Sequence, residues 1–282
     1  MPRATLPKRQ SGRLRPRRSE TVQPLVTPGS QGEAIGRLVV AGLVVSMLPA
    51  LPFGAYLAYP FAILATWFHE MGHGLTALLM GQHFEQLQIF ANGSGVAESR
   101  LAPDASRFVH AAIAAGGPLA PSAAGAGLIV ASAHPRAWKP VLWLVAAAIL
   151  SSTIVWVRSP TGFWALPLAA AIIGLVAWRG SPAWTRFSLQ FLGMLGALSS
   201  LRDWGYLFTE QVVLGGQPML SDTGAIAAAL GLPHWFWAGA ILLISGGMVG
   251  AALKYALAEH RLRPPPRKLP ANVLQFKRDT RR

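Results

Sequence analysis

The chain has 282 residues, which is enough for one large domain or two ordinary ones. Hydrophobic residues make up 52% of it and charged residues only 13%, yet the formal net charge is +14. A soluble nucleic-acid binder would be basic but also polar, so this pairing argues against that class of protein. Because cysteine is absent, disulfides and thiolate metal sites are excluded.

The positive charge is concentrated at the two ends of the chain. Residues 1–37 carry a net charge of +6 and residues 254–282 carry +7, whereas residues 38–253 carry only +1. Both ends are rich in Pro, Gly or Ser and have little apolar surface to bury. Basic flanks beside apolar spans mark the cytoplasmic side of membrane proteins. We therefore predict disordered basic cytoplasmic tails at 1–37 and 258–282, and a transmembrane domain at 38–257.

The apolar runs of this domain predict an all-α polytopic membrane protein. Residues 38–80 are long enough for two spans of about 20 residues. Further apolar runs lie at 108–133, 140–157, 161–178, 187–208 and 235–257. The very short link between 140–157 and 161–178 predicts a tight antiparallel helical hairpin. If both ends of the chain are cytoplasmic, the number of spans must be even. We therefore expect six transmembrane helices, with the segment 38–60 re-entrant or irregularly paired. If that segment also crosses the membrane, the number is seven.

One segment between the spans is expected to be extended rather than helical. Residues 85–90 roughly alternate polar and apolar side chains, and Asn92-Gly93 is a strong signal for a two-residue hairpin turn. The pattern predicts a small β-hairpin over residues 84–99.

The chemistry is concentrated in the motif His69-Glu70-Met71-Gly72-His73, which lies inside an apolar run. On a helix, residues four apart share one face, so both imidazoles can bind one metal ion. Glu70 lies about 100° further round the helix, where it can take a proton from a metal-bound water. Ionisable side chains are costly within a span, which favours a functional role over simple packing. The motif predicts a zinc site with Glu70 as the catalytic residue.

A catalytic zinc ion usually has three protein ligands, and two acidic residues in later segments are candidates for the third. Asp203 lies near the end of the apolar run 187–208, and Asp222 precedes the short apolar stretch 224–232. Each also has a simpler interpretation, because Asp203 can pair with Arg202 and Ser221-Asp222 is a plain helix N-cap pattern. Both remain candidates, and we favour Asp203.

Gly116-Gly117-Pro118 is expected to interrupt the span 108–133. Small residues let helix backbones approach closely, and proline removes a backbone donor. The triplet therefore predicts either close helix packing or room for substrate beside the zinc.

The segment around this motif resembles a known family signature. Its sequence, Phe68-His69-Glu70-Met71-Gly72-His73-Gly74, is similar to the F-H-E-x-G-H signature of the site-2 protease family of intramembrane zinc metalloproteases. The resemblance is strongest to the bacterial site-2-protease-like branch of that family. The similarity extends more loosely through the 84–99 hairpin to the segments around Asp203 and Asp222. The family's third-ligand motif, Asn-x-x-Pro followed by Asp-Gly, is absent here in its usual form. The resemblance implies that His69 and His73 bind Zn²⁺, that Glu70 is catalytic, and that the hairpin helps to present substrate.

The function predicted from the sequence is hydrolysis of peptide bonds within or near transmembrane segments of membrane proteins. The expected partners are a transmembrane protein substrate and the lipid bilayer, without nucleic acid, and the expected location is the bacterial plasma membrane. The alternative is a catalytically inactive relative or a non-enzymatic zinc-binding protein that binds transmembrane partners. A transporter would need ionisable residues along a path across several spans, whereas here they cluster at one place. A zinc hydrolase acting on lipid also remains open.

Overall fold

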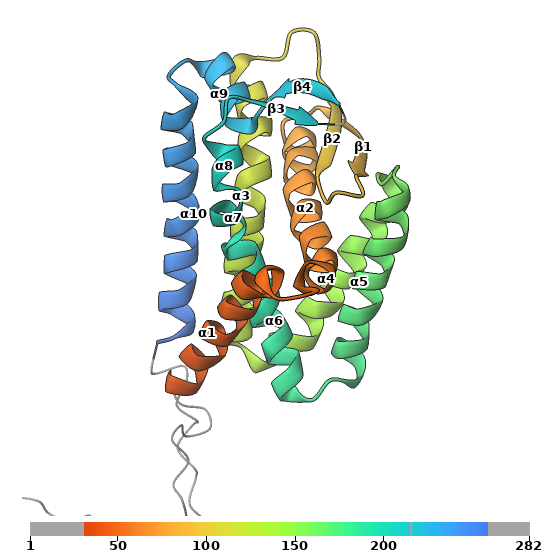
Figure 1. The fold of residues 1–282 in the computed structure, drawn as a ribbon, viewed down its shortest axis with the longest axis vertical. Coiled ribbons are helices and arrows are strands. Elements are labelled where there is room, and N and C mark those ends of the chain that lie inside the picture. Colours follow the sequence, from red (N-terminus) through yellow and green to blue (C-terminus); the bar gives the residue numbers. More distant parts are fainter. Residues whose placement is uncertain (1–30, 215, 259–282) are drawn as a thin grey trace, which may run out of the picture.

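The fold is described from a computed structural model, over residues 31–214 and 216–258. It is a helical bundle capped at one end by two small β-hairpins (Figure 1). The helices are α1 (Gln31–Met47), α2 (Gly54–Leu79), α3 (Arg107–Ser132), α4 (Trp138–Val155), α5 (Pro160–Arg179), α6 (Pro182–Ala197), α7 (Ser199–Arg202), α8 (Trp204–Leu207), α9 (Asp222–Leu230) and α10 (His234–Ala256). The strands are β1 (His83–Ile89), β2 (Gly95–Arg100), β3 (Gln211–Leu214) and β4 (Gln217–Leu220).

Helix α3 is the central element of the bundle, since it packs against α2, α6, α9 and α10. Helices α4 and α5 form the predicted antiparallel hairpin on one side of the molecule, and α10 stands on the opposite side (Figure 1). Small residues make the close crossings possible. At the crossing of α2 and α3, a Cβ on Gly72 would overlap the backbone of Gly116 and the side chain of Ala120.

Among the described residues, four helical segments are long and apolar enough to cross a membrane: Arg107–Ser132, Pro135–Val155, Pro160–Arg179 and His234–Ala256. They coincide with four of the apolar runs predicted as spans. The expected total of six or seven is not confirmed, because the other runs form shorter or more polar helices. Run 187–208 is divided among α6, α7 and α8, and α2 has 26 residues but carries His69, Glu70 and His73.

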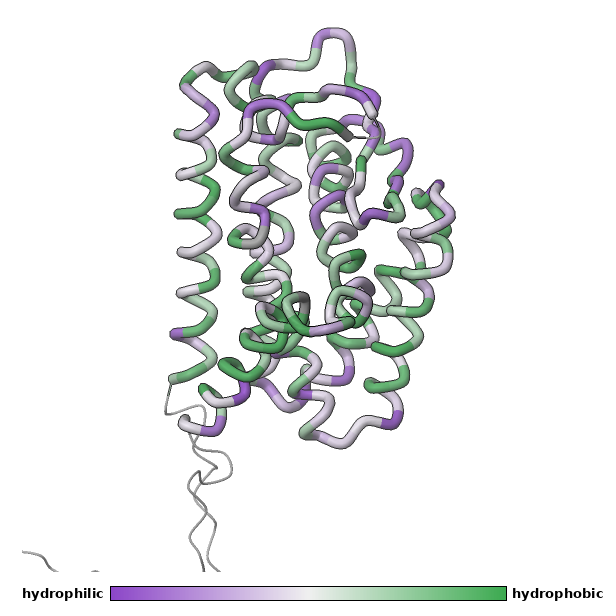
Figure 2. Tube along the Cα trace, viewed as in Figure 1, coloured by the Kyte–Doolittle hydropathy of each residue, from purple (hydrophilic) through white to green (hydrophobic). Residues whose placement is uncertain are grey.

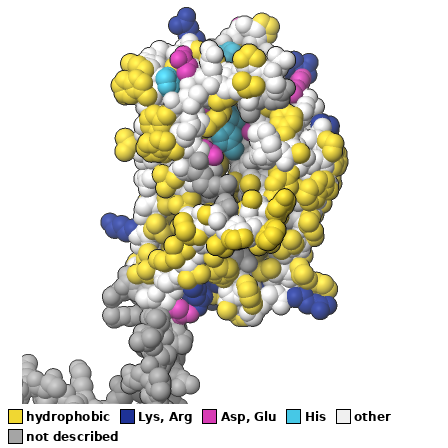
Figure 3. Space-filling view, viewed as in Figure 1, with side chains coloured by type: hydrophobic (Ala, Val, Ile, Leu, Met, Phe, Trp, Pro, Cys, Tyr) yellow, Lys and Arg dark blue, Asp and Glu magenta, His cyan; other side chains and the backbone are white. Residues whose placement is uncertain are grey.

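The outer surface of these helices is apolar. Leu144 and Ile154 on α4 and Leu243 on α10 are between 67% and 79% exposed. The apolar colouring continues along the outer helices, and hydrophobic side chains cover much of the face seen in the space-filling view (Figures 2 and 3). A continuous surface of this kind is unfavourable in water and favourable in a bilayer. The apolar helices thus indicate a membrane protein.

The segment 38–60 contains a sharp change of direction. Helix α1 ends at Met47, a short 3₁₀ turn spans Leu48–Ala50, and α2 starts at Gly54. Phe53 has a φ of 59°, in the left-handed region, at the N-cap of α2. Helix α1 begins at Gln31, inside the segment 1–37 expected to be a tail. Residues 1–30 and 259–282, which make up most of both predicted tails, lie outside the described residues.

The predicted hairpin is present as β1 and β2, paired antiparallel from His83 and Arg100 to Ile89 and Gly95. One edge of this hairpin is occupied by the connection between α4 and α5. The Leu87 N–H donates to the carbonyl of Trp156, the Arg158 N–H donates to the carbonyl of Leu87, both at 2.9 Å, and the Ile89 N–H donates to Ser159 Oγ. In the described part of the chain, no strand pairs with the other edge, which belongs to β2. A second hairpin, β3–β4, was not predicted.

Candidate metal centre and catalytic cavity

Helix α2 presents His69 and His73 on one face, as their spacing requires. The two Nε2 atoms lie 3.2 Å apart. The Nδ1 of His73 lies 2.8 Å from the carbonyl oxygen of Ile113 in α3. A carbonyl can only accept, so Nδ1 carries the proton and Nε2 of the neutral ring keeps a lone pair for a metal.

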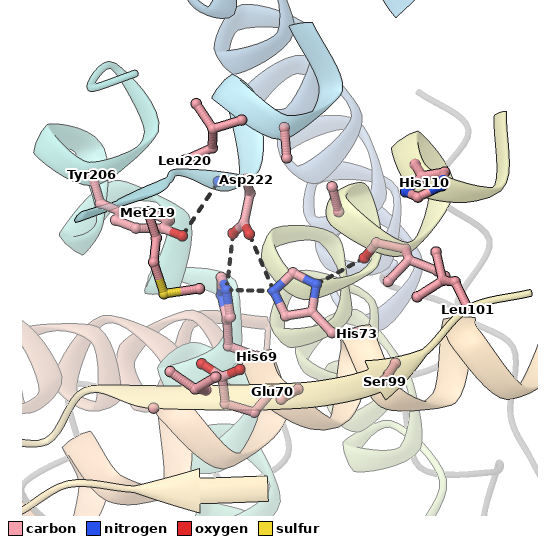
Figure 4. A pocket seen from close by; sticks show the side chains of 16 residues that line it. His69, Glu70, His73, Ser99, Leu101, His110, Tyr206, Met219, Leu220 and Asp222 are labelled. Atoms are coloured by element: carbon pink, nitrogen blue, oxygen red, sulfur yellow. Dashed lines mark hydrogen bonds and ion pairs between the residues drawn. The ribbon is translucent and has the colours of Figure 1, made fainter. Parts of the chain in front are cut away.

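Asp222 approaches the two histidines from α9 (Figure 4). Its Oδ2 lies 3.0 Å from Nε2 of His69, and its Oδ1 lies 3.2 Å from Nε2 of His73. The position of Asp222 is fixed by the start of the helix. Ser221 is the N-cap, and its Oγ accepts from the Gly224 N–H at 3.1 Å. Ser221 therefore caps α9, while the next residue points into the site.

The three side chains form a group whose ligand atoms all lie within 4.8 Å of one another. A tetrahedral zinc ion with ligands at 2.0–2.1 Å has ligand-to-ligand distances of about 3.3 Å. The nitrogen-to-nitrogen and nitrogen-to-oxygen distances of 3.0–3.2 Å in this group are close to that value. Asp222 Oδ2 is fully buried and has no partner with hydrogen-bond geometry, although it lies 3.0 Å from a histidine nitrogen. The donor set thus fits a cation better than it fits hydrogen bonding alone.

The charge of the site also favours a cation. The side chains of Glu70 and Asp222 are both buried, at 6% and 8% exposure. In the part of the chain that the structure describes, no Lys or Arg lines the cavity that contains them. Burying unpaired carboxylates is costly, and a divalent ion bound by the neutral histidines would compensate them.

The cavity around this group has a volume of about 270 Å³. Its walls come from α2, β2, the start of α3, α8, β4 and α9. On the face shown in the space-filling view, histidine and acidic side chains gather in a hollow beneath the hairpins (Figure 3). The site can therefore be reached from outside the bundle, although its two carboxylates are buried.

Glu70 lies against strand β2 of the first hairpin. Gly95 is the residue that makes this contact possible, because a Cβ there would lie 2.8 Å from Cγ and 3.0 Å from Oε1 of Glu70. The backbone N–H of the nearby Ala97 interacts with the same carboxylate. Strand β2 thus positions Glu70 next to the histidine pair, and its own backbone forms part of the cavity wall.

Gly116, Gly117 and Pro118 do not interrupt α3, which runs unbroken from Arg107 to Ser132. Gly116 lies against the backbone of Gly72 and the side chain of Thr76. A Cβ on Gly117 would overlap the imidazole ring of His73. The pair therefore serves close packing, and its second glycine leaves the space that the His73 ring occupies.

The structure places Asp203 outside the group formed by His69, His73 and Asp222. Asp203 lies between α7 and α8, where its Oδ2 accepts from Ser199 Oγ at 3.2 Å. It lines a second cavity of about 350 Å³, which it shares with His69 and Glu70. The side chain of Arg202, its alternative partner, lies outside the described residues. The geometry thus brings Asp222, and not Asp203, next to the two histidines.

Two features of the site were missed by the sequence reasoning. The second hairpin contributes Met219 and Leu220 to the cavity. The Gly-Gly pair at 215–216, flanked by apolar residues, is a turn signal that could have identified this hairpin. Tyr206 also lines the cavity, and its hydroxyl oxygen lies 3.3 Å from the backbone nitrogen of Asp222. No local pattern marks this tyrosine.

Comparison with known families gives one result. The model of the peptidase M50B-like family matches residues 37–252, which include every residue of the site. No match was found among curated proteins or among solved structures.

Proposed function

Because the chain belongs to the peptidase M50B-like family, we propose that it is an intramembrane zinc metalloprotease that cleaves peptide bonds within or near transmembrane segments of other proteins. The observation that carries this proposal is the convergence of His69, His73 and Asp222 beside a buried Glu70. We propose His69, His73 and Asp222 as the zinc ligands. The membrane would be the bacterial plasma membrane, with both ends of the chain in the cytoplasm.

When bound, zinc polarises the scissile carbonyl and makes a water molecule more acidic. The protein supplies the remaining steps. Glu70, held by β2, takes the proton of the attacking water and later delivers it to the leaving amine. His73 keeps its orientation because Ile113 binds its Nδ1 proton. The buried position of these groups strengthens every electrostatic interaction among them.

The free edge of β2 offers a binding mode for substrate. The opposite edge of this hairpin is occupied by residues 156–159, so within the hairpin only the β2 edge can accept another extended segment in the described part of the chain. Residues Val96, Ala97 and Ser99 of β2 line the catalytic cavity. A transmembrane helix that unwinds locally could add to this edge as a strand, which exposes its peptide bond beside Glu70.

The proposal is tested by comparing wild type with Glu70→Gln, both purified as full-length protein in detergent with their zinc content measured. We expect both to bind zinc, and we expect cleavage of a panel of single-span membrane proteins to fall by about 10²- to 10⁴-fold in the variant. Glu85→Gln, at an exposed position on β1, is the matched control and should cleave normally. Equal cleavage by wild type and Glu70→Gln, or a wild type without zinc, would contradict the proposal.

A further inference from the structure

Tyr206 lies in the catalytic cavity but is neither a proposed zinc ligand nor the proposed base. It lies on the short helix α8, and its hydroxyl points toward Asp222 and His69 (Figure 4). The tyrosine ring meets the imidazole of His69 edge to face, with ring centres 6.2 Å apart. Among the described residues, only four line both the catalytic cavity and the second cavity, namely His69, Glu70, Gly95 and Tyr206. Tyr206 therefore lies next to the base and a proposed ligand.

The hydrogen bonding of this hydroxyl leaves its proton available as a donor. The hydroxyl oxygen accepts from the backbone N–H of Asp222 at 3.3 Å. This N–H belongs to the first residue of α9 and has no partner within the helix. The nearby Asp222 carboxylate also acts electrostatically on this hydroxyl. A substrate carbonyl bound in the cavity would compete with that carboxylate for the proton.

Such a donor accelerates peptide hydrolysis. When water adds to the carbonyl carbon, a carbon–oxygen bond forms and the water proton passes to Glu70, while the π electrons of the carbonyl move onto its oxygen. That oxygen becomes an anion in a cavity that also holds the buried side chain of Asp222. A donor that is fixed before the reaction stabilises this charge more than it stabilises the neutral substrate.

We propose that the Tyr206 hydroxyl donates a hydrogen bond to the carbonyl oxygen of the scissile peptide and keeps its own proton throughout. This inference rests on the proposed function. It assigns Tyr206 as a catalytic residue that contacts the reacting atoms from α8, whereas Glu70 acts from α2.

The test uses full-length Tyr206→Phe in detergent, with a membrane-protein substrate that wild type cleaves. Loss of one such donor costs about 10²- to 10³-fold in kcat in other hydrolases. We expect a loss of that order with KM changed less than about threefold, unchanged zinc content and an unchanged melting temperature. A phosphinic analogue of the cleaved bond, which mimics the tetrahedral intermediate, should lose affinity in parallel with kcat. Tyr59→Phe is the control, because the Tyr59 hydroxyl donates to the Ala91 carbonyl at the exposed hairpin turn.

The outcomes separate this inference from the function on which it rests. Undiminished kcat in Tyr206→Phe, together with an inactive Glu70→Gln, overturns the role of Tyr206 alone. Loss of zinc from Tyr206→Phe also overturns it, because the tyrosine would then only position Asp222. A wild type that cleaves no substrate overturns both proposals.

Discussion

At the scale of single residues, the site depends on a division of labour between two carboxylates. Glu70 lies under β2 with its carboxylate beside the backbone of Ala97, whereas Asp222 faces the two histidine nitrogens. Both are buried, yet only Asp222 lies within ligand distance of the imidazoles. In the proposed mechanism, their surroundings rather than their chemical type give one the role of proton transfer and the other that of metal binding.

This division predicts opposite results for the two aspartates considered as third ligands. Asp222→Asn keeps the shape of the side chain but removes its charge. We expect zinc affinity to fall by more than the roughly 10- to 100-fold that follows removal of a group that only orients a ligand. Asp203→Asn removes an acceptor for Ser199 in the neighbouring cavity, and we expect it to bind zinc as wild type does. Zinc titration of the purified variants decides between them, and an Asp203→Asn protein without zinc would restore Asp203 as the ligand.

At the scale of elements, the orientation of His73 is set by α3. The Ile113 carbonyl holds Nδ1, and Gly117 leaves room for the ring one helical turn further along. The contact between α2 and α3 therefore orients a proposed metal ligand as well as packing the bundle.

Two glycines of α3 test this coupling. Gly117→Ala places a methyl group where the His73 ring lies, so we expect zinc affinity to fall by about tenfold or more as the ring is displaced. Gly127→Ala makes the same substitution in the same helix, but nothing lies within 4 Å of the added Cβ. It should bind zinc normally and gain up to about 1 kcal/mol of helix stability. Zinc affinity and thermal unfolding measured for both variants provide the check. Equal zinc affinities of Gly117→Ala and Gly127→Ala would show that the His73 ring tolerates the added methyl group.

At the scale of the whole molecule, the apolar outer surface and the polar cavity divide the protein into two environments. Leu243 is 79% exposed on the outer face of α10, whereas Asp104 is exposed in the loop before α3. In a bilayer, lipid would cover the first position and water would reach the second.

The absence of cysteine makes this difference directly measurable. In opened membranes, a membrane-impermeant maleimide should modify Asp104→Cys readily. We expect it to modify Leu243→Cys more than about tenfold more slowly, because a lipid-covered thiol does not ionise. Dissolving the membrane in sodium dodecyl sulfate should equalise the two rates. Similar labelling at both positions in the intact membrane would place α10 outside the lipid.

Local patterns predicted the parts of the structure that depend on neighbours in the sequence. The four-residue spacing of His69 and His73, the hairpin around Asn92-Gly93 and four of the apolar helices are of this kind. The position of Asp222 is different, because it depends on how α9 packs against α3, and no spacing encodes that contact. The run 187–208 was predicted as one span because hydropathy does not reveal where a helix breaks. Tyr206 escaped notice for the same reason, since its role depends on a break near Asp203.

The two halves of the proposed metal site come from opposite ends of the domain. His69 and His73 leave the ribosome before more than half of the chain has been made, and Asp222 follows 149 residues after His73. At about 5–20 residues per second, the interval is about 7–30 s. During that time the growing chain has the proposed base and two proposed ligands but lacks the third. Under this assignment the ligand set is completed only when α9 has docked, so hydrolysis would begin late in the synthesis of the chain.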